Sequence, residues 1–355
     1  MAQPKLDRAL RKLYGASVPP TELTKLRGDA STRMYYRARI EGPGPGLPAQ
    51  LIVMQLPEDA FRSDEGGTQP AMARLPFLEV AELLTSRGLP VPKIYAEDLQ
   101  NGLILIEDLG DVTLERRLQA TPRLKWPELY ARAVDLLVKL HDRCDDVPSN
   151  SVVCRRRFDR QLLDWELAHF REWGLEALFG QLDEKATITL DRVFECIVSE
   201  IEAMPQGFVH RDYQSKNLMV GAAGALSILD FQDALLGPRV YDLVALLCDS
   251  YVPLALDLQE SMIERYAALR RIDLDAVRRE FWLVALHRKL KDAGRFVYID
   301  RVRKNPDFLQ WYPQSLVYVA RAIARAPDMA DLGDLLQSVI PGYPDAVPVP
   351  RSSLE

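Results

Sequence analysis

Short apolar runs separated by polar turns fill the N-terminal third of the chain. Such runs, bounded by Gly, Pro, Asp or Ser, are typical of strands. They predict strands over residues 23–27, 32–40, 50–56, 94–95 and 102–106. Residues 5–14 and 76–87 are predicted to be helices; in the second, Phe77, Val80, Ala81 and Leu84 recur at the spacing of one helical face. This part of the chain is therefore expected to form a small antiparallel β lobe.

A helical period dominates the chain from residue 127 onward. Apolar side chains three or four residues apart are typical of amphipathic helices. They predict helices over residues 127–143, 160–179, 187–203, 238–250, 258–270, 275–298 and 312–325. Short apolar runs at 207–209, 218–220 and 227–229 interrupt the pattern and predict strands, the last two joined by a turn at 221–224. The fold class is thus α+β, with the small lobe followed by a larger, mainly helical one.

Polar residues of a recognisable order lie between these short strands. The first group is His210-Arg211-Asp212-Tyr213-Gln214-Ser215-Lys216-Asn217, and the second is Asp230-Phe231-Gln232-Asp233. A strand leading into His-Arg-Asp, an Asn after four further residues, and then a hairpin ending in Asp-Phe is the arrangement of the phosphoryl-transfer loops of protein-kinase-like enzymes. Each short motif alone occurs by chance on many surfaces. Their order, spacing and flanking strands together predict a kinase-like site.

Each position in this arrangement has a chemical role. Asp212 is expected to orient a substrate hydroxyl and accept its proton. Asn217 and Asp230 offer the oxygen ligands that Mg²⁺ prefers. The hairpin would bring these two side chains together. His210, at the end of a buried strand, is expected to pack and to hydrogen-bond the loop rather than to exchange protons.

Length and composition limit the class of protein. The 355 residues exceed one typical domain, and 48% apolar with 27% charged residues is ordinary for a soluble globular protein. A net charge of −6 argues against general nucleic-acid binding, which needs a basic face. The four Cys and four His residues show no zinc spacing, so reduced thiols are expected. The absence of a signal segment or a long apolar span predicts a cytoplasmic protein that does not bind membranes.

Several segments carry a resemblance to known enzymes. They are Ile52-Val53-Met54, Gly88-Leu89-Pro90-Val91-Pro92, Leu105-Ile106-Glu107-Asp108-Leu109-Gly110-Asp111, the two groups above, Gly237-Pro238-Arg239-Val240-Tyr241-Asp242-Leu243 and Leu290-Lys291-Asp292-Ala293-Gly294. The chain resembles the aminoglycoside phosphotransferase and choline kinase-like family. It is most similar to its bacterial anomeric kinases for N-acetylmuramate and N-acetylglucosamine. The resemblance implies a protein-kinase-like two-lobe fold, with residues 1–108 binding nucleotide and residues 109–355 carrying catalysis and substrate binding. ATP and Mg²⁺ are the implied cofactors.

The expected nucleotide contacts lie in the small lobe. The turn at residues 28–31 has a single glycine, so Ser31 or Thr32 would share the phosphate contact with backbone amides. Backbone groups of the hinge, represented by Glu107 and Leu109, would hydrogen-bond adenine.

Kinases place a lysine on the third strand to bind the phosphates. Here that strand contains Met54 and no lysine. The corresponding strand of the anomeric sugar kinases also contains methionine and lacks the lysine. Arg33, Arg37 or Lys25 substitutes, or the enzyme works without such a cation. Glu79, the natural partner of that lysine, is then expected on the helix surface.

Three further residues have secondary roles. The family resemblance implies that Asp242, in the first turn of a helix, braces the catalytic loop. Asp233 either faces substrate or caps a turn, and the sequence favours neither. Lys216 is expected to point to solvent rather than to the transferred phosphoryl group.

Three functions remain open from sequence. The leading one is phosphorylation of a hydroxyl, the anomeric one, on a small-molecule amino sugar by a monomer or weak dimer. The second is an aminoglycoside or amino-alcohol phosphotransferase. The residues Trp165, Glu166, Arg171, Arg295 and Arg303 are mixed in character and do not decide between them. The third is a pseudokinase scaffold, which the missing strand lysine and the thin glycine loop suggest.

Overall fold

The structure, a computed structural model, describes residues 3–26, 33–57 and 74–353. The chain divides into two compact units: unit 1 comprises Met1–Val112 and Met219–Gln232, and unit 2 comprises Thr113–Leu218 and Asp233–Glu355. A single cut after residue 108, as the sequence suggests, does not describe the segment 219–232. That segment joins unit 1 because the backbone N–H of Val220 donates to Val112 at 2.8 Å and that of Ile228 donates to Pro90 at 2.7 Å. The roles assigned to the two parts of the chain stay predictions.

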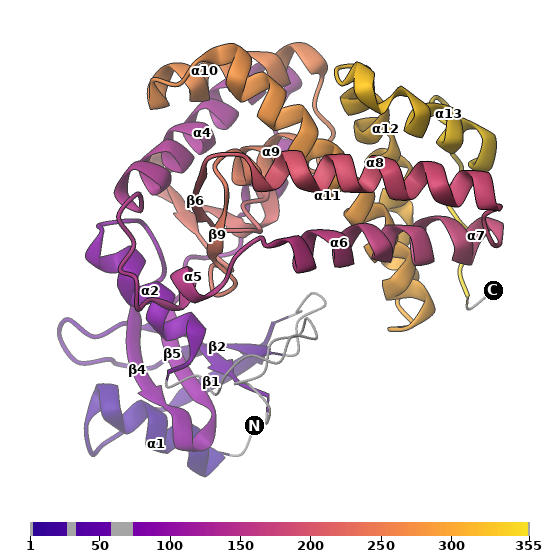
Figure 1. Cartoon of the computed structure of the whole chain (residues 1–355). Coiled ribbons are helices and arrows are strands. Elements are labelled where there is room, and N and C mark those ends of the chain that lie inside the picture. Colours follow the sequence, from indigo (N-terminus) through magenta and orange to yellow (C-terminus); the bar gives the residue numbers. More distant parts are fainter. Residues whose placement is uncertain (1–2, 27–32, 58–73, 354–355) are drawn as a thin grey trace. The chain divides into compact units, whose positions relative to one another are not determined.

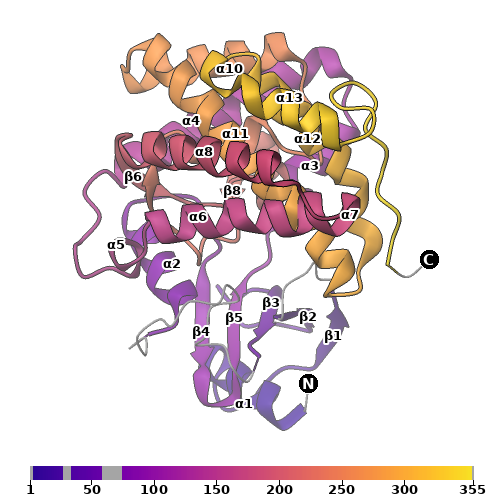
Figure 2. The same cartoon turned by 45° about the vertical axis from the view of Figure 1, so that its right-hand side comes forward.

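Unit 1 is built on an antiparallel sheet of five strands in the order β1-β2-β3-β5-β4 (Figures 1 and 2). The strands are β1 (Thr21–Lys25), β2 (Met34–Ile40), β3 (Gln50–Gln55), β4 (Ile94–Asp98) and β5 (Leu103–Glu107). Each predicted strand is present, although residues 27 and 32, at the ends of two predictions, lie outside the described residues. Val53 in the middle strand pairs with Tyr36 on one side and with Leu105 on the other.

Two helices complete the core of unit 1. Helix α1 (Gln3–Tyr14) packs Leu6 and Leu10 against Leu51 and Val53 of the sheet. Helix α2 (Pro76–Ser86) begins with proline, which is well tolerated in a first turn. Its apolar face is buried as the spacing predicts, and the short 3₁₀ turn η1 (Leu99–Asn101) links β4 to β5.

The hairpin of unit 1 is short and follows the predicted pattern. Strand β7 (Leu218–Val220) pairs with β8 (Leu226–Ile228) across the turn η5 (Ala222–Gly224). Just beyond β8, the ring of Phe231 stacks on Phe77 of α2, with centroids 5.2 Å apart and planes inclined by 18°. This contact fixes the chain immediately after Asp230.

Unit 2 is mainly helical (Figures 1 and 2). Its longer helices are α4 (Trp126–Arg143), α6 (Arg160–His169), α8 (Glu184–Glu202), α9 (Tyr241–Leu247), α10 (Leu256–Arg270), α11 (Leu274–Arg301), α12 (Tyr312–Ile323) and α13 (Ala330–Val339). The shorter ones are α3 (Leu114–Gln119), α5 (Val152–Arg155), α7 (Ala177–Phe179), η2 (Arg123–Lys125), η3 (Phe170–Glu176), η4 (Ser215–Asn217), η6 (Pro306–Trp311) and η7 (Pro327–Met329). Helix α11 lies at the centre, with most of its side chains buried.

The predicted helix over residues 238–250 begins three residues too early. Strand β9 (Leu235–Pro238) occupies the preceding segment and pairs antiparallel with β6 (Gln206–Val209). Its backbone groups are bonded to a strand distant in sequence, so helix α9 starts only at Tyr241.

The predicted helix over residues 160–179 is interrupted. Its middle, η3, is a π-helical turn between α6 and α7, although the three elements follow one line in Figure 2. Glycines allow close packing here: a Cβ on Gly294 of α11 would lie 2.8 Å from the backbone oxygen of His169. The wider turn accommodates the neighbouring helix at this point.

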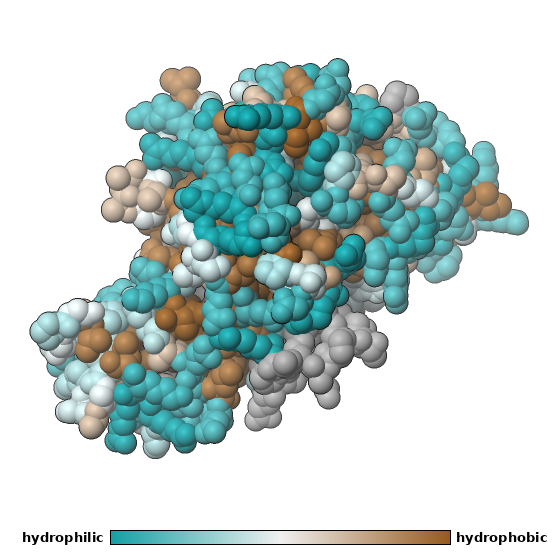
Figure 3. Space-filling model, turned by 60° about the vertical axis from the view of Figure 1, so that its left-hand side comes forward, coloured by the Kyte–Doolittle hydropathy of each residue, from teal (hydrophilic) through white to brown (hydrophobic). Residues whose placement is uncertain are grey.

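The surface drawn in Figure 3 is mostly hydrophilic, with apolar residues in small groups. Among the described helices, none combines the length and the apolar character that crossing a membrane requires.

Candidate active site

The loop that contains Asp212 is braced at its start by Asp242 from helix α9. The Oδ2 atom of this buried carboxylate accepts the backbone N–H of His210 at 2.7 Å, and Oδ1 accepts that of Arg211 at 2.9 Å. His141 approaches the same carboxylate at 3.3 Å. Arg211 has a φ of 80°, in the left-handed region that a non-glycine residue rarely adopts. The two hydrogen bonds hold this strained turn, as the brace expected of Asp242 requires.

A second carboxylate, Asp249, braces the later part of the loop. The Oδ2 atom of Asp249 accepts two hydrogen bonds from Ser215, one from the backbone N–H at 3.0 Å and one from the hydroxyl at 2.6 Å. Its Oδ1 accepts the N–H of Tyr251 at 2.9 Å. Burial raises the pKa of Asp249, against the lowering effect of these hydrogen bonds. Asp249 was missed from sequence; it lies just beyond the end of α9, seven residues after Asp242, and no motif marks it.

Asp212 stands among positive charges. Its side chain is 40% exposed, and its Oδ1 lies 3.5 Å from Nη2 of Arg288, which is only 2% exposed. Burial raises the pKa of Asp212, but the charges of Arg288, Lys291, Arg211 and Lys216 outweigh this and lower it overall. Asp212 is therefore an ionised carboxylate at neutral pH, able to accept a hydrogen bond from a hydroxyl.

Asn217 is tied to the same loop. Its Nδ2 donates to the backbone oxygen of Asp212 at 2.8 Å, and the residue is 9% exposed. Because the nitrogen end of the amide makes this bond, Oδ1 is the end that can act as an oxygen ligand. The loop thus presents a carboxylate and an amide oxygen from one rigid segment.

Asp230 belongs to unit 1 and is held locally. Its φ of 61° is left-handed, and its Oδ1 accepts a hydrogen bond from Gln232 at 2.8 Å. The stacked Phe231 anchors the next residue. The expected meeting of Asp230 with Asp212 and Asn217 stays a prediction.

The two predicted metal ligands, Asn217 and Asp230, carry oxygen atoms of the kind that magnesium binds. Mg²⁺ is usually bound through one or two protein oxygen ligands, with phosphates and water completing the shell. In the part of the chain that the structure describes, no cluster of three or more His, Cys, Asp or Glu side chains could hold a metal. Asn217 offers an amide oxygen and Asp230 a carboxylate oxygen, each of the type that such a site uses, and their meeting at one ion stays a prediction.

Comparison with known proteins now identifies the family. The model of the phosphotransferase enzyme family matches residues 22–281. The chain belongs to this family. It is 32% identical over 351 residues to the N-acetylmuramate/N-acetylglucosamine kinase of Pseudomonas aeruginosa, covering 95% of each chain. The protein of the same name from Neisseria meningitidis is 27% identical, over 90% of this chain and 91% of its own.

Solved structures confirm the protein-kinase-like fold. A choline kinase of Streptococcus pneumoniae superposes with a TM-score of 0.55 at 17% identity, covering 86% of this chain and 95% of its own. Aminoglycoside 2'-phosphotransferase-IIIa, solved as its GDP complex, gives 0.58 at 16% identity and covers 92% and 100%. The family and the fold class expected from the motifs are therefore both confirmed.

The phosphotransferase lacks the usual lysine on β3, where Met54 is fully buried. Of the three candidate substitutes, Arg37 is engaged elsewhere: its Nε lies 2.6 Å from Asp108, and Nη2 lies 2.8 Å from Asp111. Arg33 hydrogen-bonds the hydroxyl of Tyr35. Burial raises the pKa of Tyr35, and the charge of Asp230 raises it further, against the lowering effect of Arg33. Arg33 and Asp230 thus both act on the Tyr35 hydroxyl, and Arg33 stays a candidate substitute.

The expected nucleotide contacts stay predictions. Ser31 and Thr32 lie outside the described residues. The backbone N–H of Glu107 already donates to the carbonyl of Lys93 at 2.8 Å, so this group is occupied within the sheet. A backbone contact from Leu109 to adenine stays a prediction.

Three polar residues around the loop are also placed. His210 is fully buried and packs edge-on against Tyr213, as expected. Lys216 does not point into solvent: its Nζ lies 4.8 Å from the centre of the Tyr251 ring. Asp233 is 44% exposed and 3.8 Å from Arg156, which leaves its role open.

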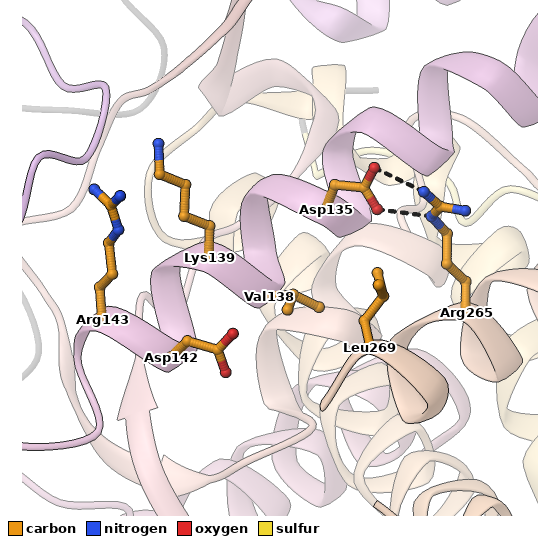
Figure 4. A pocket seen from close by; sticks show the side chains of 7 residues that line it. All are labelled: Asp135, Val138, Lys139, Asp142, Arg143, Arg265 and Leu269. Carbon is orange, nitrogen blue, oxygen red and sulfur yellow. Dashed lines mark hydrogen bonds and ion pairs between the residues drawn. The ribbon is translucent and has the colours of Figure 1, made fainter. Parts of the chain in front are cut away.

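A pocket of about 290 Å³ opens elsewhere in unit 2, between α4 and α10 (Figure 4). It is lined by Asp135, Val138, Lys139, Asp142, Arg143, Arg265 and Leu269. Arg265 and Asp135 form two hydrogen bonds of 2.7 Å across it. The pocket contains none of the predicted site residues.

Proposed function

We propose that the protein transfers the γ-phosphoryl group of ATP to the anomeric hydroxyl of an amino sugar such as N-acetylmuramate or N-acetylglucosamine. The observation that carries this proposal is the similarity, over 95% of both chains, to a kinase named for those two sugars. The braced loop with an ionised Asp212 supplies the matching chemistry. Work in the cytoplasm, as a monomer or weak dimer, belongs to the same proposal.

The chain's own residues position the reaction. Asp212 accepts a hydrogen bond from the attacking hydroxyl and takes its proton late, since phosphoryl transfer depends mainly on alignment and charge stabilisation. Asn217 and Asp230 would hold Mg²⁺, which, when bound, neutralises the charge of the phosphates. The braces from Asp242 and Asp249 keep the loop in one conformation throughout.

The charge around Asp212 argues against cationic acceptors. Arg211, Lys216, Arg288 and Lys291 all act electrostatically on this carboxylate. Aminoglycosides carry several positive charges and would be repelled here, whereas a neutral or anionic sugar would not. The amino-alcohol and aminoglycoside alternative is therefore the weaker one.

A coupled ADP-release assay with Mg·ATP tests the proposal. The acceptors are N-acetylmuramate, N-acetylglucosamine, choline and an aminoglycoside, with the 1-O-methyl glycoside of N-acetylglucosamine as a matched control that lacks the free anomeric hydroxyl. Turnover is expected with the two free sugars alone. Turnover with the methyl glycoside would refute the anomeric position. Turnover confined to choline or the aminoglycoside would refute the acceptor class, and none with any acceptor would favour a pseudokinase.

A further inference from the structure

Helix α11 has a partly exposed face that continues past Arg288, the residue that contacts Asp212. Within residues 290–300, every side chain is buried except Lys291, Arg295 and Tyr298. Their spacing of four and three residues puts them on one face. Arg288, which contacts Asp212, begins the same row. At the helical rise of 1.5 Å per residue, Arg295 lies about 10 Å along the axis from Arg288.

Aromatic side chains from α6 and η3 meet the far end of this row. Trp165, 44% exposed, stacks on His169 with ring centroids 5.1 Å apart. Tyr298 lies 5.0 Å from His169 and 5.4 Å from Trp173. Helices α6 and α11 are in contact along this region, as Figures 1 and 2 also show. We name Trp165, Trp173, Lys291, Arg295 and Tyr298 the acceptor face.

The acceptor face is tied to the catalytic loop at a second point. Glu166, next to Trp165, is 1% exposed, and its Oε1 lies 3.4 Å from Nη2 of Arg211. The segment of α6 that presents Trp165 is therefore connected to the residue before Asp212. Two elements, α6 and α11, thus lead from the catalytic carboxylate to the aromatic cluster.

The charged members of the acceptor face are cations. Burial lowers the pKa of Lys291, but Tyr241, Asp292 and Glu166 raise it more, so its ammonium group stays protonated. The guanidinium carbon of Arg295 lies 5.3 Å from the centre of the Tyr298 ring. An aromatic surface with a cation beside it suits a sugar that carries a negative charge. The aromatic rings pack on the apolar C–H groups of the sugar, and the cation binds the carboxylate of the sugar.

We propose that the acceptor face binds the sugar and that Arg295 recognises a carboxylate on it. The acceptor class selected would be a carboxylate-bearing N-acetyl amino sugar. N-acetylmuramate differs from N-acetylglucosamine by a lactyl ether that carries a carboxylate, so the enzyme would favour the former. This inference rests on the proposed function and deepens it.

Arg295→Gln tests the inference with the two sugars as internal comparison. The kcat/KM for N-acetylmuramate should fall about tenfold or more, mainly through KM, because a charge-assisted hydrogen bond is lost. The value for N-acetylglucosamine should stay near that of the wild type, which also shows that the variant is folded. Arg295→Lys should restore part of the loss. Arg303→Gln, which removes an equal charge from an exposed position beyond α11, is the matched control and should leave both sugars unaffected.

Trp165→Ala separates ring packing from charge recognition. It should raise KM for both sugars together, since both have the same pyranose ring. An unchanged KM for both would show that Trp165 does not contact the acceptor and would contradict the proposed face.

The outcomes separate this inference from the proposed function. Equal losses for the two sugars in Arg295→Gln, or no loss, would overturn carboxylate recognition while the kinase activity stands. If the wild type turned over neither sugar, the proposed function would fail. Calorimetric titration of both sugars then decides the inference independently: tighter binding of N-acetylmuramate that is lost in Arg295→Gln supports it, and any other result overturns it.

Discussion

The Nη2 atom of Arg288 lies 3.5 Å from the Oδ1 atom of Asp212. The same guanidinium donates from Nη1 to the backbone oxygen of Arg211 at 2.9 Å. A buried arginine on α11 therefore contacts both the predicted catalytic carboxylate and the loop that carries it. This contact orients Asp212 and favours its ionised form.

Replacing Arg288 with Met should impair catalysis and change its pH dependence. The pKa of Asp212 is lowered in the folded protein, so removing a positive charge should raise it toward or above the ordinary value of about 3.9. The acid limb of kcat/KM should then move to higher pH, and the value at neutral pH should fall about tenfold to a hundredfold. A pH profile of both proteins measures this. An acid limb that does not move would contradict the role of Arg288, and Arg303→Gln is the control for a lost positive charge.

Asp249 should be needed for the geometry of the loop. In Asp249→Asn, an amide nitrogen replaces one of two accepting oxygens, so either the Ser215 or the Tyr251 contact is lost. We expect kcat to fall by about tenfold. Misplacing a catalytic group commonly costs more, and here only one of the contacts of Asp249 is lost. Ser215→Ala removes only the hydroxyl contact and should destabilise the protein by about 1 kcal/mol. Steady-state kinetics with thermal melting distinguishes the two, and full activity in Asp249→Asn would show that the brace is dispensable.

The ion pair of Arg37 with Asp108 should stabilise unit 1 in a pH-dependent way. Burial raises the pKa of Asp108, but the hydrogen bonds from Arg37, Gly110 and Gln50 lower it overall. A lowered folded-state pKa gives stability that is present above the unfolded value and lost as the pH falls through the folded value. Arg37→Met should therefore lower the free energy of unfolding by about 3 kcal/mol at neutral pH and by less in acid.

Urea denaturation at neutral and acid pH measures this difference. Arg265→Met is the matched control, because its pair with Asp135 is exposed at 39% and 46% and should contribute less than about 1 kcal/mol. A cost for Arg37→Met that is the same at both pH values would show that the Asp108 charge is not involved.

Asp230 should be required for metal-dependent nucleotide binding. Asp230→Ala removes the predicted carboxylate ligand, so titration with Mg·ATP should show lost affinity, whereas ATP in the presence of a chelator should bind both proteins alike. Asp233→Ala, three residues away and 44% exposed, is the matched control and should keep Mg·ATP affinity. Unchanged Mg·ATP affinity in Asp230→Ala would remove it from the metal site.

The spacing of apolar residues along the chain was enough to predict helices and strands that bury one regular apolar face. The helix around Phe77 and Leu84 and the strand around Val53 follow directly from the spacing of apolar residues. Strand β9 could not be predicted this way. Its four residues include Gly237 and Pro238, and they are extended because they pair with the distant strand β6 and with the segment at residues 156–158.

The site shows the same division between local and tertiary information. Asp212, Asn217 and Asp230 are recognisable because their spacing is local to one loop and one hairpin. Asp249 and Arg288 carry no such motif. Their importance comes from contacts with residues 34 and 76 positions away, Ser215 and Asp212. The π-helical turn at η3 likewise depends on Gly294 of α11, far along the chain.

The catalytic role of Asp212 is tested by the ADP-release rate of Asp212→Asn with N-acetylmuramate and N-acetylglucosamine. We expect kcat to fall by about 10²-fold or more, while Mg·ATP affinity, measured by titration of the same preparation, stays close to that of the wild type. Turnover of both sugars at the wild-type rate by Asp212→Asn would contradict this catalytic role.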